Sequence, residues 1–285
     1  MIYILIAIFC SVIVSINFKL FKRYYTNSFQ AIVFNYPVAA LLCYFFLKPD
    51  LSNQPNQNQW LLFGIVAVML ISIFYFVGKS IATSGIVLTA IAQRLSLVIP
   101  VLSAFLIFSE TTTIVKIIGL AIGLIAIYLS KPTGKTDFKL MINWYPIIVF
   151  LGTGIIDVLF NTLTKFDGIN FTTSLVYIFT IASILGFASL IYQKIAGTLK
   201  FQFKAALAGL VLGLFNFGSI YFYIKALQIE KDQPSVVFAS LDIGVIMIGS
   251  LIGILLFKEQ LSLLNKIGIG LAILAIAILN LPNAF

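Results

Sequence analysis

Two copies of one short pattern decide the fold of this chain: Tyr75–Lys79 (YFVGK) and Tyr221–Lys225 (YFYIK), 146 residues apart. Each copy ends a long apolar run. A second pattern, Phe-x-Glu, closes the next run in each half, at Phe108–Glu110 and Phe257–Glu259, 149 residues apart. Both offsets are about half of the 285 residues. The sequence therefore predicts two copies of one unit, residues 1–140 and residues 141–285.

The composition indicates that the chain uses lipid as its solvent. Hydrophobic residues make up 61% and charged residues 9%, and the mean hydropathy is +1.11. Soluble domains have roughly 45–50% apolar and about 25% charged residues. A soluble core of this length cannot bury so much apolar surface, so we expect an integral membrane protein.

The apolar runs predict ten membrane-spanning helices, five in each half. Each run is near the ~20 residues that a helix needs to cross a ~30 Å hydrocarbon layer. With ends uncertain by a few residues, the runs are 1–20, 30–47, 60–79, 85–108, 113–130, 144–164, 171–192, 205–226, 234–257 and 263–281. Because five crossings reverse the side on which the second half begins, the fold class is an all-α membrane protein of two inverted five-helix repeats, an architecture recurrent in transporters.

The positive charges lie mainly in loops, so the net charge of +9 predicts topology rather than nucleic-acid binding. Loops after odd-numbered helices hold twelve lysines and arginines, and loops after even-numbered helices hold five. Positively charged loops favour the cytoplasm. The count therefore places the odd-numbered loops in the cytoplasm and both termini outside.

These patterns resemble the drug/metabolite transporter superfamily, in its EamA-like branch. The resemblance rests on the two motif pairs, on Pro100 in the fourth run and on the glycine-spaced run that follows Glu110. It implies a transporter of small metabolites such as amino acids, sugars or their conjugates, often acting outward. The resemblance also implies cytoplasmic termini, whereas the lysine count favours the reverse. The second copy departs from the pattern, since Gly249 stands opposite Pro100.

Three ionisable residues fall well inside apolar runs: Arg94, Asp157 and Asp242. At 1.5 Å per residue, Arg94 lies ~13 Å and Asp157 ~20 Å in from one side of the membrane, and Asp242 lies ~12 Å in from the opposite side. In a ~30 Å hydrocarbon core all three therefore lie near the midplane. A charge there costs about 2.5–3.5 kcal/mol on insertion scales, so it faces a cavity or a partner. Gln93 aligns with Asp242 in the repeat. One interpretation is a structural ion pair between helices; the other is that Arg94 binds an anionic group or holds an aspartate that takes up a proton.

Three asparagines form a second group of candidate substrate contacts: Asn216, Asn161 and Asn35. An amide in lipid needs a hydrogen-bonding partner, so each should face protein or water. The alternative is a set of helix–helix hydrogen bonds without a substrate. Asn216, ~16 Å along its helix, is the best candidate of the three.

The repeated motifs themselves are better explained by structure. Glu110 and Glu259 precede new helices, where a carboxylate can cap free amides. Lys79 and Lys225 are expected to snorkel from helix ends. Close helix approaches are expected at four glycines: Gly119, Gly123, Gly268 and Gly270. Tyr75, Tyr221 and Tyr223 are expected to be interface anchors, with gating as the alternative.

An enzyme is not expected. An intramembrane aspartyl protease would use Asp157 and Asp242 as a dyad, but residues 152–157 (GTGIID) lack a Gly-x-Gly-Asp motif. The chain has no histidine, which excludes His-based zinc sites and Ser-His-Asp triads, and no phosphate loop of the Walker type appears. A lipid-linked flippase and a non-transporting membrane subunit stay as alternatives.

The sequence thus predicts a secondary transporter, acting by alternating access, in the cytoplasmic membrane. We expect no cofactor, no metal and no nucleic acid. The expected partners are a small-molecule substrate, an amino acid or related polar solute by charge balance, and the lipid bilayer. Export, proton coupling and a homodimer are open options.

Overall fold

The computed structural model describes residues 2–96, 98–99, 103, 114–129, 143–164, 168–229, 234–258 and 261–279. Its described residues form helices, and each overlaps one of the predicted runs: α1 (Ile2–Arg23), α2 (Ser28–Leu47), α3 (Gln57–Ser84), α4 (Ile86–Leu95), α6 (Ile114–Leu129), α7 (Tyr145–Thr164), α8 (Phe171–Ile195), α9 (Phe203–Ile229), α10 (Pro234–Leu255) and α11 (Leu263–Leu279). The all-helical prediction is therefore confirmed for the described part. Five of these helices, α1, α2, α3, α8 and α9, are long and apolar enough to cross a membrane. Ten crossings in two inverted repeats stay a prediction.

Local signals explain where α2 and α3 begin. The Asn27 side chain accepts a hydrogen bond from the backbone of Gln30 at the start of α2. At α3, Asn56 and Gln59 form a reciprocal capping box, which satisfies two amides that the helix leaves free. The predicted capping residues Glu110 and Glu259 lie outside the described residues, as does Pro100.

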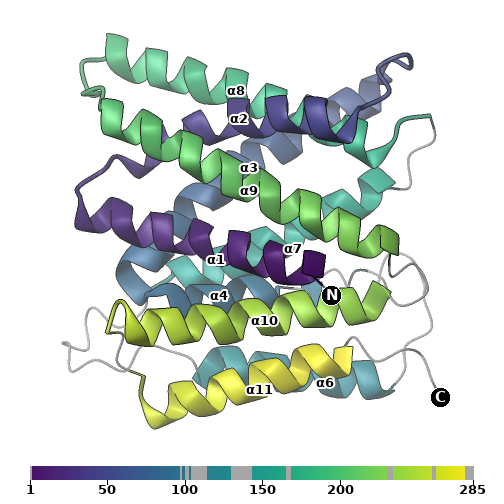
Figure 1. Ribbon diagram of the computed structural model, residues 1–285, viewed down its shortest axis with the longest axis vertical. Helices are drawn as coiled ribbons and strands as arrows, with labels where there is room; N and C mark the ends of the chain where they lie inside the picture. Colours follow the sequence, from purple (N-terminus) through teal and green to yellow (C-terminus); the bar gives the residue numbers. More distant parts are fainter. Residues whose placement is uncertain are drawn as a thin grey trace.

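The helices are stacked one beside another along the long axis of the molecule, and each runs roughly across that axis (Figure 1). One end is formed by α8 and α2, and the other by the paired α6 and α11 (Figure 1). Between them, α9 packs against α2 and α1, α1 packs against α10, and α4 packs against both α10 and α7. The start of α1 and the end of α11 lie on the same side of the bundle (Figure 1).

Apolar side chains fill the space between helices and also cover the outside. The largest buried cluster surrounds Phe18, Tyr36 and Phe63. A second cluster joins α4 and α10 to α6 and α11, and a third joins α1 to α9 and α10. Many large apolar side chains are exposed, Phe9 and Ile65 among them. An apolar exterior of this kind suits lipid contact.

The closest helix contacts at glycines in the described structure lie outside the predicted set of four, of which Gly119 and Gly268 are buried and their close approach stays a prediction. A Cβ atom at Gly209 would lie 2.5 Å from the Ala31 carbonyl oxygen, and one at Gly213 would lie 2.7 Å from the Asn35 carbonyl oxygen. α9 therefore rests directly on the backbone of α2. At Gly270, by contrast, nothing lies within 4 Å, so the prediction of close approach is wrong there: this glycine faces open space.

The predicted close contact at Gly123 also fails. A Cβ atom there would meet only ordinary side-chain neighbours, at 3.4 Å or more. The α6–α11 pair is held by its buried apolar side chains, such as Ala126, Ala275 and Ile276, so this contact does not depend on the absence of a side chain at Gly123.

The repeated Tyr-Phe-x-x-Lys motif makes the same contact in both copies. Lys79 lies over the ring of Tyr75 at 5.4 Å, and Lys225 lies over the ring of Tyr221 at 5.6 Å. The motif does not end either helix, because α3 continues to Ser84 and α9 to Ile229. Each lysine is held against its own helix by cation–π attraction.

Candidate functional site

The site forms where α4 meets α10, near the middle of the bundle. Arg94 Nη1 donates a hydrogen bond to Asp242 Oδ1 at 3.0 Å, and the two groups form an ion pair. Their side chains are 22% and 13% exposed. The pair is therefore partly accessible, although both residues come from apolar helices. The structure thus joins two of the three charges predicted from the sequence.

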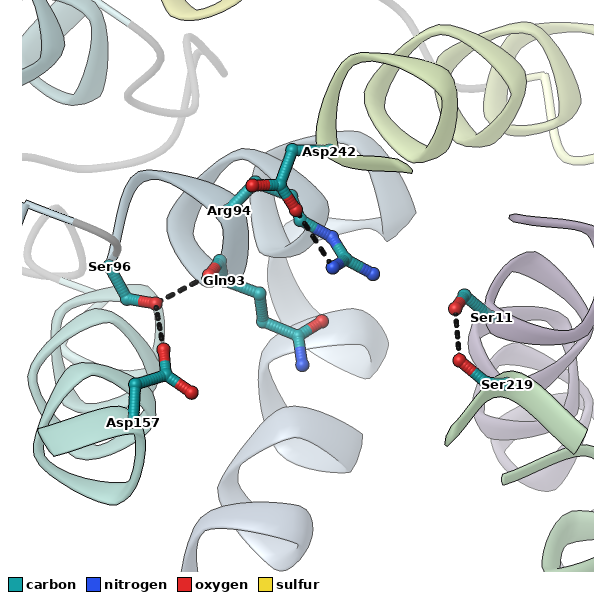
Figure 2. A network of polar contacts seen from close by, with 7 residues as sticks. All are labelled: Ser11, Gln93, Arg94, Ser96, Asp157, Ser219 and Asp242. Atoms are coloured by element: carbon teal, nitrogen blue, oxygen red, sulfur yellow. Dashed lines mark hydrogen bonds and ion pairs between the residues drawn. The ribbon is translucent and has the colours of Figure 1, made fainter. Parts of the chain in front are cut away.

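Asp157 reaches the site from α7. Ser96, just after α4, donates to the Gln93 carbonyl oxygen at 2.5 Å and lies 3.5 Å from Asp157 Oδ2 (Figure 2). Because a hydroxyl carries one proton, the shorter bond takes it, and the contact with Asp157 is weak. Asp157 also interacts electrostatically with Asp242 and Arg94. All three predicted charges therefore belong to one electrostatic cluster.

The Arg94 guanidinium keeps unused donors. It carries five N–H groups, and its buried Nε has no hydrogen-bond partner in the described structure. Figure 2 shows the guanidinium extending from α4 toward the side where Ser11 and Ser219 join α1 to α9. Gln93, on the same turn, extends its amide into the space between Asp157 and these serines (Figure 2). Arginine and glutamine together can donate to a carboxylate or another anion.

Two features of the site were missed from the sequence. The hydroxyls of Ser11 and Ser219 are 2.6 Å apart and connect α1 to α9. Tyr223, one turn after Ser219, interacts electrostatically with Asp242, Asp157 and Arg94, so it belongs beside the charged cluster rather than serving only as an interface anchor. The i, i+4 spacing of Ser219 and Tyr223 puts both on one face of α9, and this spacing was the available signal.

Thr153 is a third missed residue. It lies one turn before Asp157 on α7, and its buried Oγ1 has no hydrogen-bond partner in the described structure. A buried hydroxyl without a partner is uncommon in proteins. Its place on the Asp157 side of α7 makes it a further polar position near the cluster.

The asparagines are arranged differently. Asn216 on α9 donates to Asn35 on α2 at 3.2 Å, so this pair is a helix–helix hydrogen bond. Asn35 is fully buried, and its Nδ2 has no partner in the described structure. Asn161 falls on α7, but its side chain lies outside the described residues. The geometry thus favours the structural interpretation for Asn35 and Asn216.

Comparisons with known proteins agree with this architecture. The family model of the EamA-like transporter family matches residues 1–131. An uncharacterized protein of Haemophilus influenzae is 38% identical over 287 residues, which covers 96% of this chain and 95% of the relative. The family comprises multi-pass membrane transporters of the drug/metabolite transporter superfamily. From these matches, we conclude that the chain belongs to the EamA-like transporter family.

Proposed function

We propose that this protein is a secondary transporter that exports a small zwitterionic metabolite, an amino acid or related polar solute, across the cytoplasmic membrane. The single observation that carries the proposal is the Arg94–Asp242 ion pair with its unused guanidinium donors. Charged groups inside a membrane protein usually mark a substrate or ion path.

The packing of the helices supports a scaffold of two inverted repeats. When the five helices of each half are matched in order, the contacts of α1 with α9 and α10 correspond to those of α7 with α3 and α4. The contact of α2 with α9 corresponds to that of α8 with α3. Three contacts join a helix to its own counterpart in the other half: α2 with α8, α4 with α10, and α6 with α11. A two-fold axis in the membrane plane would produce this pattern.

On this scaffold, the ion pair links the two helices that meet at the axis. Arg94 lies on α4 and Asp242 on α10, and these are corresponding helices of the two halves. A site at the interface between repeats can open to either side when one half rocks against the other. The location of the pair therefore supports alternating access.

The charge balance supports a zwitterionic substrate. Arg94 and the Gln93 amide are suited to a carboxylate, since arginine binds carboxylates with paired hydrogen bonds. Among the described residues, the hydrogen-bond contact of Asp157 is a weak one with the Ser96 hydroxyl, and its carboxylate is suited to an ammonium group. A molecule carrying both groups would complete the cluster without leaving a buried charge unpaired.

Proton coupling follows as a second part of the proposal. When the substrate leaves, its ammonium group no longer pairs with Asp157, and an unpaired charge in a low-dielectric site is costly. Uptake of a proton by Asp157 removes that cost, and the ammonium group of the next substrate displaces the proton. Substrate and proton would then occupy the site in opposite steps, as in exchange of protons for exported solute.

A transport panel tests the proposal. The purified protein in proteoliposomes is given labelled amino acids, nucleobases and sugars under an imposed pH gradient. We expect saturable flux of an amino-acid-like solute and a loss of at least tenfold in Arg94→Ala. Arg23→Ala is the matched control, because Arg23 is exposed at the end of α1, and it should keep wild-type flux.

The proton step has its own pair of variants, Asp157→Asn and Asp242→Asn. We expect at least one of them to lose pH-dependent counter-transport while still binding substrate. Unchanged pH dependence in both variants contradicts the coupling. An absence of saturable, protein-dependent flux across the panel contradicts transport of these solutes and favours a lipid-linked cargo or a non-transporting subunit.

A further inference from the structure

A cavity of about 790 Å³ lies away from the charged cluster, at the corner where α1 turns into α2. Its walls come from the end of α1, the following turn, α3 and the end of α8. None of Arg94, Asp157 and Asp242 lines it. The volume falls within the ~300–1,000 Å³ typical of small-ligand sites. We call this cavity the α1–α3 groove.

The α1–α3 groove opens toward the lipid. Ser72 and Lys79, two of its lining residues, are exposed on α3. They continue an exposed stripe that includes Leu61, Ile65 and Val68 at helical spacing. Because that stripe is the apolar outer face of a membrane helix, the groove is a lateral opening beside it.

The two ends of the groove differ in chemistry. Lys22 and Lys79 supply positive charge, and no acidic side chain is among the lining residues. The groove extends along α3 from Lys79 to Ser72, a distance of ~10 Å. The part nearer Ser72 is apolar and aromatic and is lined by Ile71, Tyr75 and Phe76. A basic mouth over an apolar interior is the charge pattern of a lipid headgroup above its acyl chain.

The lysines are held in place at the mouth. Lys22 Nζ donates to the Ala82 carbonyl oxygen at 2.5 Å, and Lys79 lies over the Tyr75 ring at 5.4 Å. An ammonium group has three donors, so Lys22 keeps two for a ligand. Thr26, Ser28 and Gln193 add uncharged polar groups to the lining. These side chains can bond to phosphate oxygens without competing negative charge.

We propose that the α1–α3 groove binds an anionic phospholipid. The headgroup phosphate lies between Lys22 and Lys79, and one acyl chain lies against Ile71 and Tyr75. The α1–α2 and α8–α9 turns meet at this end of the bundle, where Lys204 donates to the Tyr24 carbonyl oxygen. These turns also carry Arg23 and Lys200. Anionic lipid is therefore favoured on the same side. The binding does not depend on the transported substrate, because the groove and the charged cluster share no residue.

Native mass spectrometry of the purified protein tests this proposal. The protein in detergent is given equal amounts of phosphatidylglycerol and phosphatidylcholine, and the occupancy of each adduct is measured. We expect one phosphatidylglycerol to bind preferentially. Each lysine near a headgroup contributes about fivefold, so Lys22→Ala/Lys79→Ala should bind roughly 25-fold more weakly. The single variant Lys79→Ala keeps the Lys22–Ala82 bond and should lose about fivefold.

Two further variants separate the groove from general surface charge. Lys258→Ala/Lys266→Ala removes the same charge from exposed positions after α10 and in α11, and its binding should stay within about twofold of wild type. Ser72→Trp fills the groove and keeps both lysines. In the part of the chain that the structure describes, the Ser72 hydroxyl bonds within its own helix, to the Val68 carbonyl oxygen, so this variant should fold normally and lose the lipid.

Three results would overturn the proposal. They are equal occupancy of the wild type and the Lys22/Lys79 double variant, equal binding of phosphatidylcholine, and full displacement of the lipid by an equal concentration of glycerol phosphate. The last result would assign the groove to a soluble anion. Thermal unfolding in the absence of lipid shows whether each variant is folded, so a loss of binding by a folded variant supports the assignment.

Discussion

Neutralising both members of the Arg94–Asp242 pair distinguishes an ion pair that only holds α4 to α10 from one that also binds substrate. The variants are Arg94→Gln, Asp242→Asn and the combination of both. Each single change leaves one charge without its partner in an apolar bundle. The double change leaves two amides that can bond to each other, with no charge left at this contact.

The size of the effect follows from the geometry. The 3.0 Å contact between Nη1 and Oδ1 places the charge centres roughly 4 Å apart, which at an effective dielectric constant of about 20 gives an attraction of about 4 kcal/mol. The partial exposure of both side chains weakens this attraction. We expect each single variant to lose about 2–3 kcal/mol of unfolding free energy. The double variant should recover to within about 1 kcal/mol of wild type.

Two measurements are made on the same four proteins: unfolding in detergent micelles and flux in proteoliposomes. If Arg94 binds the substrate, the double variant regains stability and stays inactive, with flux lowered at least tenfold. Arg23→Gln, at an exposed position, serves as control and should change stability by less than about 0.5 kcal/mol. The reasoning is refuted if flux returns together with stability, because the pair would then be structural only.

Other predictions concern packing and topology. Gly213→Ala should lower the free energy of unfolding by about 1–3 kcal/mol, because its Cβ atom would lie 2.7 Å from the α2 backbone. Gly270→Ala should raise it by roughly 0.5–1 kcal/mol in the same assay, since no described atom lies within 4 Å of its Cβ position. Equal effects of the two variants would contradict the packing. Asn216→Ala should cost about 0.6–1.7 kcal/mol, the usual value of an interhelical hydrogen bond in a membrane protein, and keep wild-type flux; lost flux in a folded variant would restore this residue to the site. If the odd-numbered loops are cytoplasmic, Lys48→Cys should react with an impermeant maleimide in intact cells and Lys200→Cys should not. Both native cysteines are buried and give little background labelling. Labelling of Lys200→Cys instead of Lys48→Cys would overturn the orientation.

The sequence was sufficient for the helices because the signals for them are local. Long apolar runs predict helices wherever they occur, and each predicted run overlaps one helix, although several helices extend a few residues beyond the run. The three charges were identified for the same reason, since an ionisable residue in an apolar run stands out from its neighbours. The capping asparagines of α2 and α3 are also short-range signals, although the sequence interpretation gave the capping role to glutamates.

The partners of these residues could not be read in the same way. The alignment of Asp242 with Gln93 in the repeat put Asp242 on the helix that corresponds to that of Arg94, but it did not show whether Asp242 or Asp157 pairs with Arg94. The structure pairs Arg94 with Asp242 because α4 packs on α10 at that level. Tyr223 carried an ordinary interfacial signal, and only the position of α9 brings it to the charged cluster. Likewise, the amide bond of Asn216 depends on the contact of α9 with α2.

The sequence by itself determined that this protein is a membrane-embedded helical bundle, where its helices lie along the chain, and which charged residues are buried in them. Tertiary structure decided which helices touch, which glycines allow close contact, and which charges pair. The physical reason is that lipid surrounds every helix with the same apolar solvent, so the hydrophobic effect specifies helices but hardly distinguishes their neighbours. Close packing and a few polar bonds make that choice, and both depend on the rotation and depth of each helix in the assembled bundle.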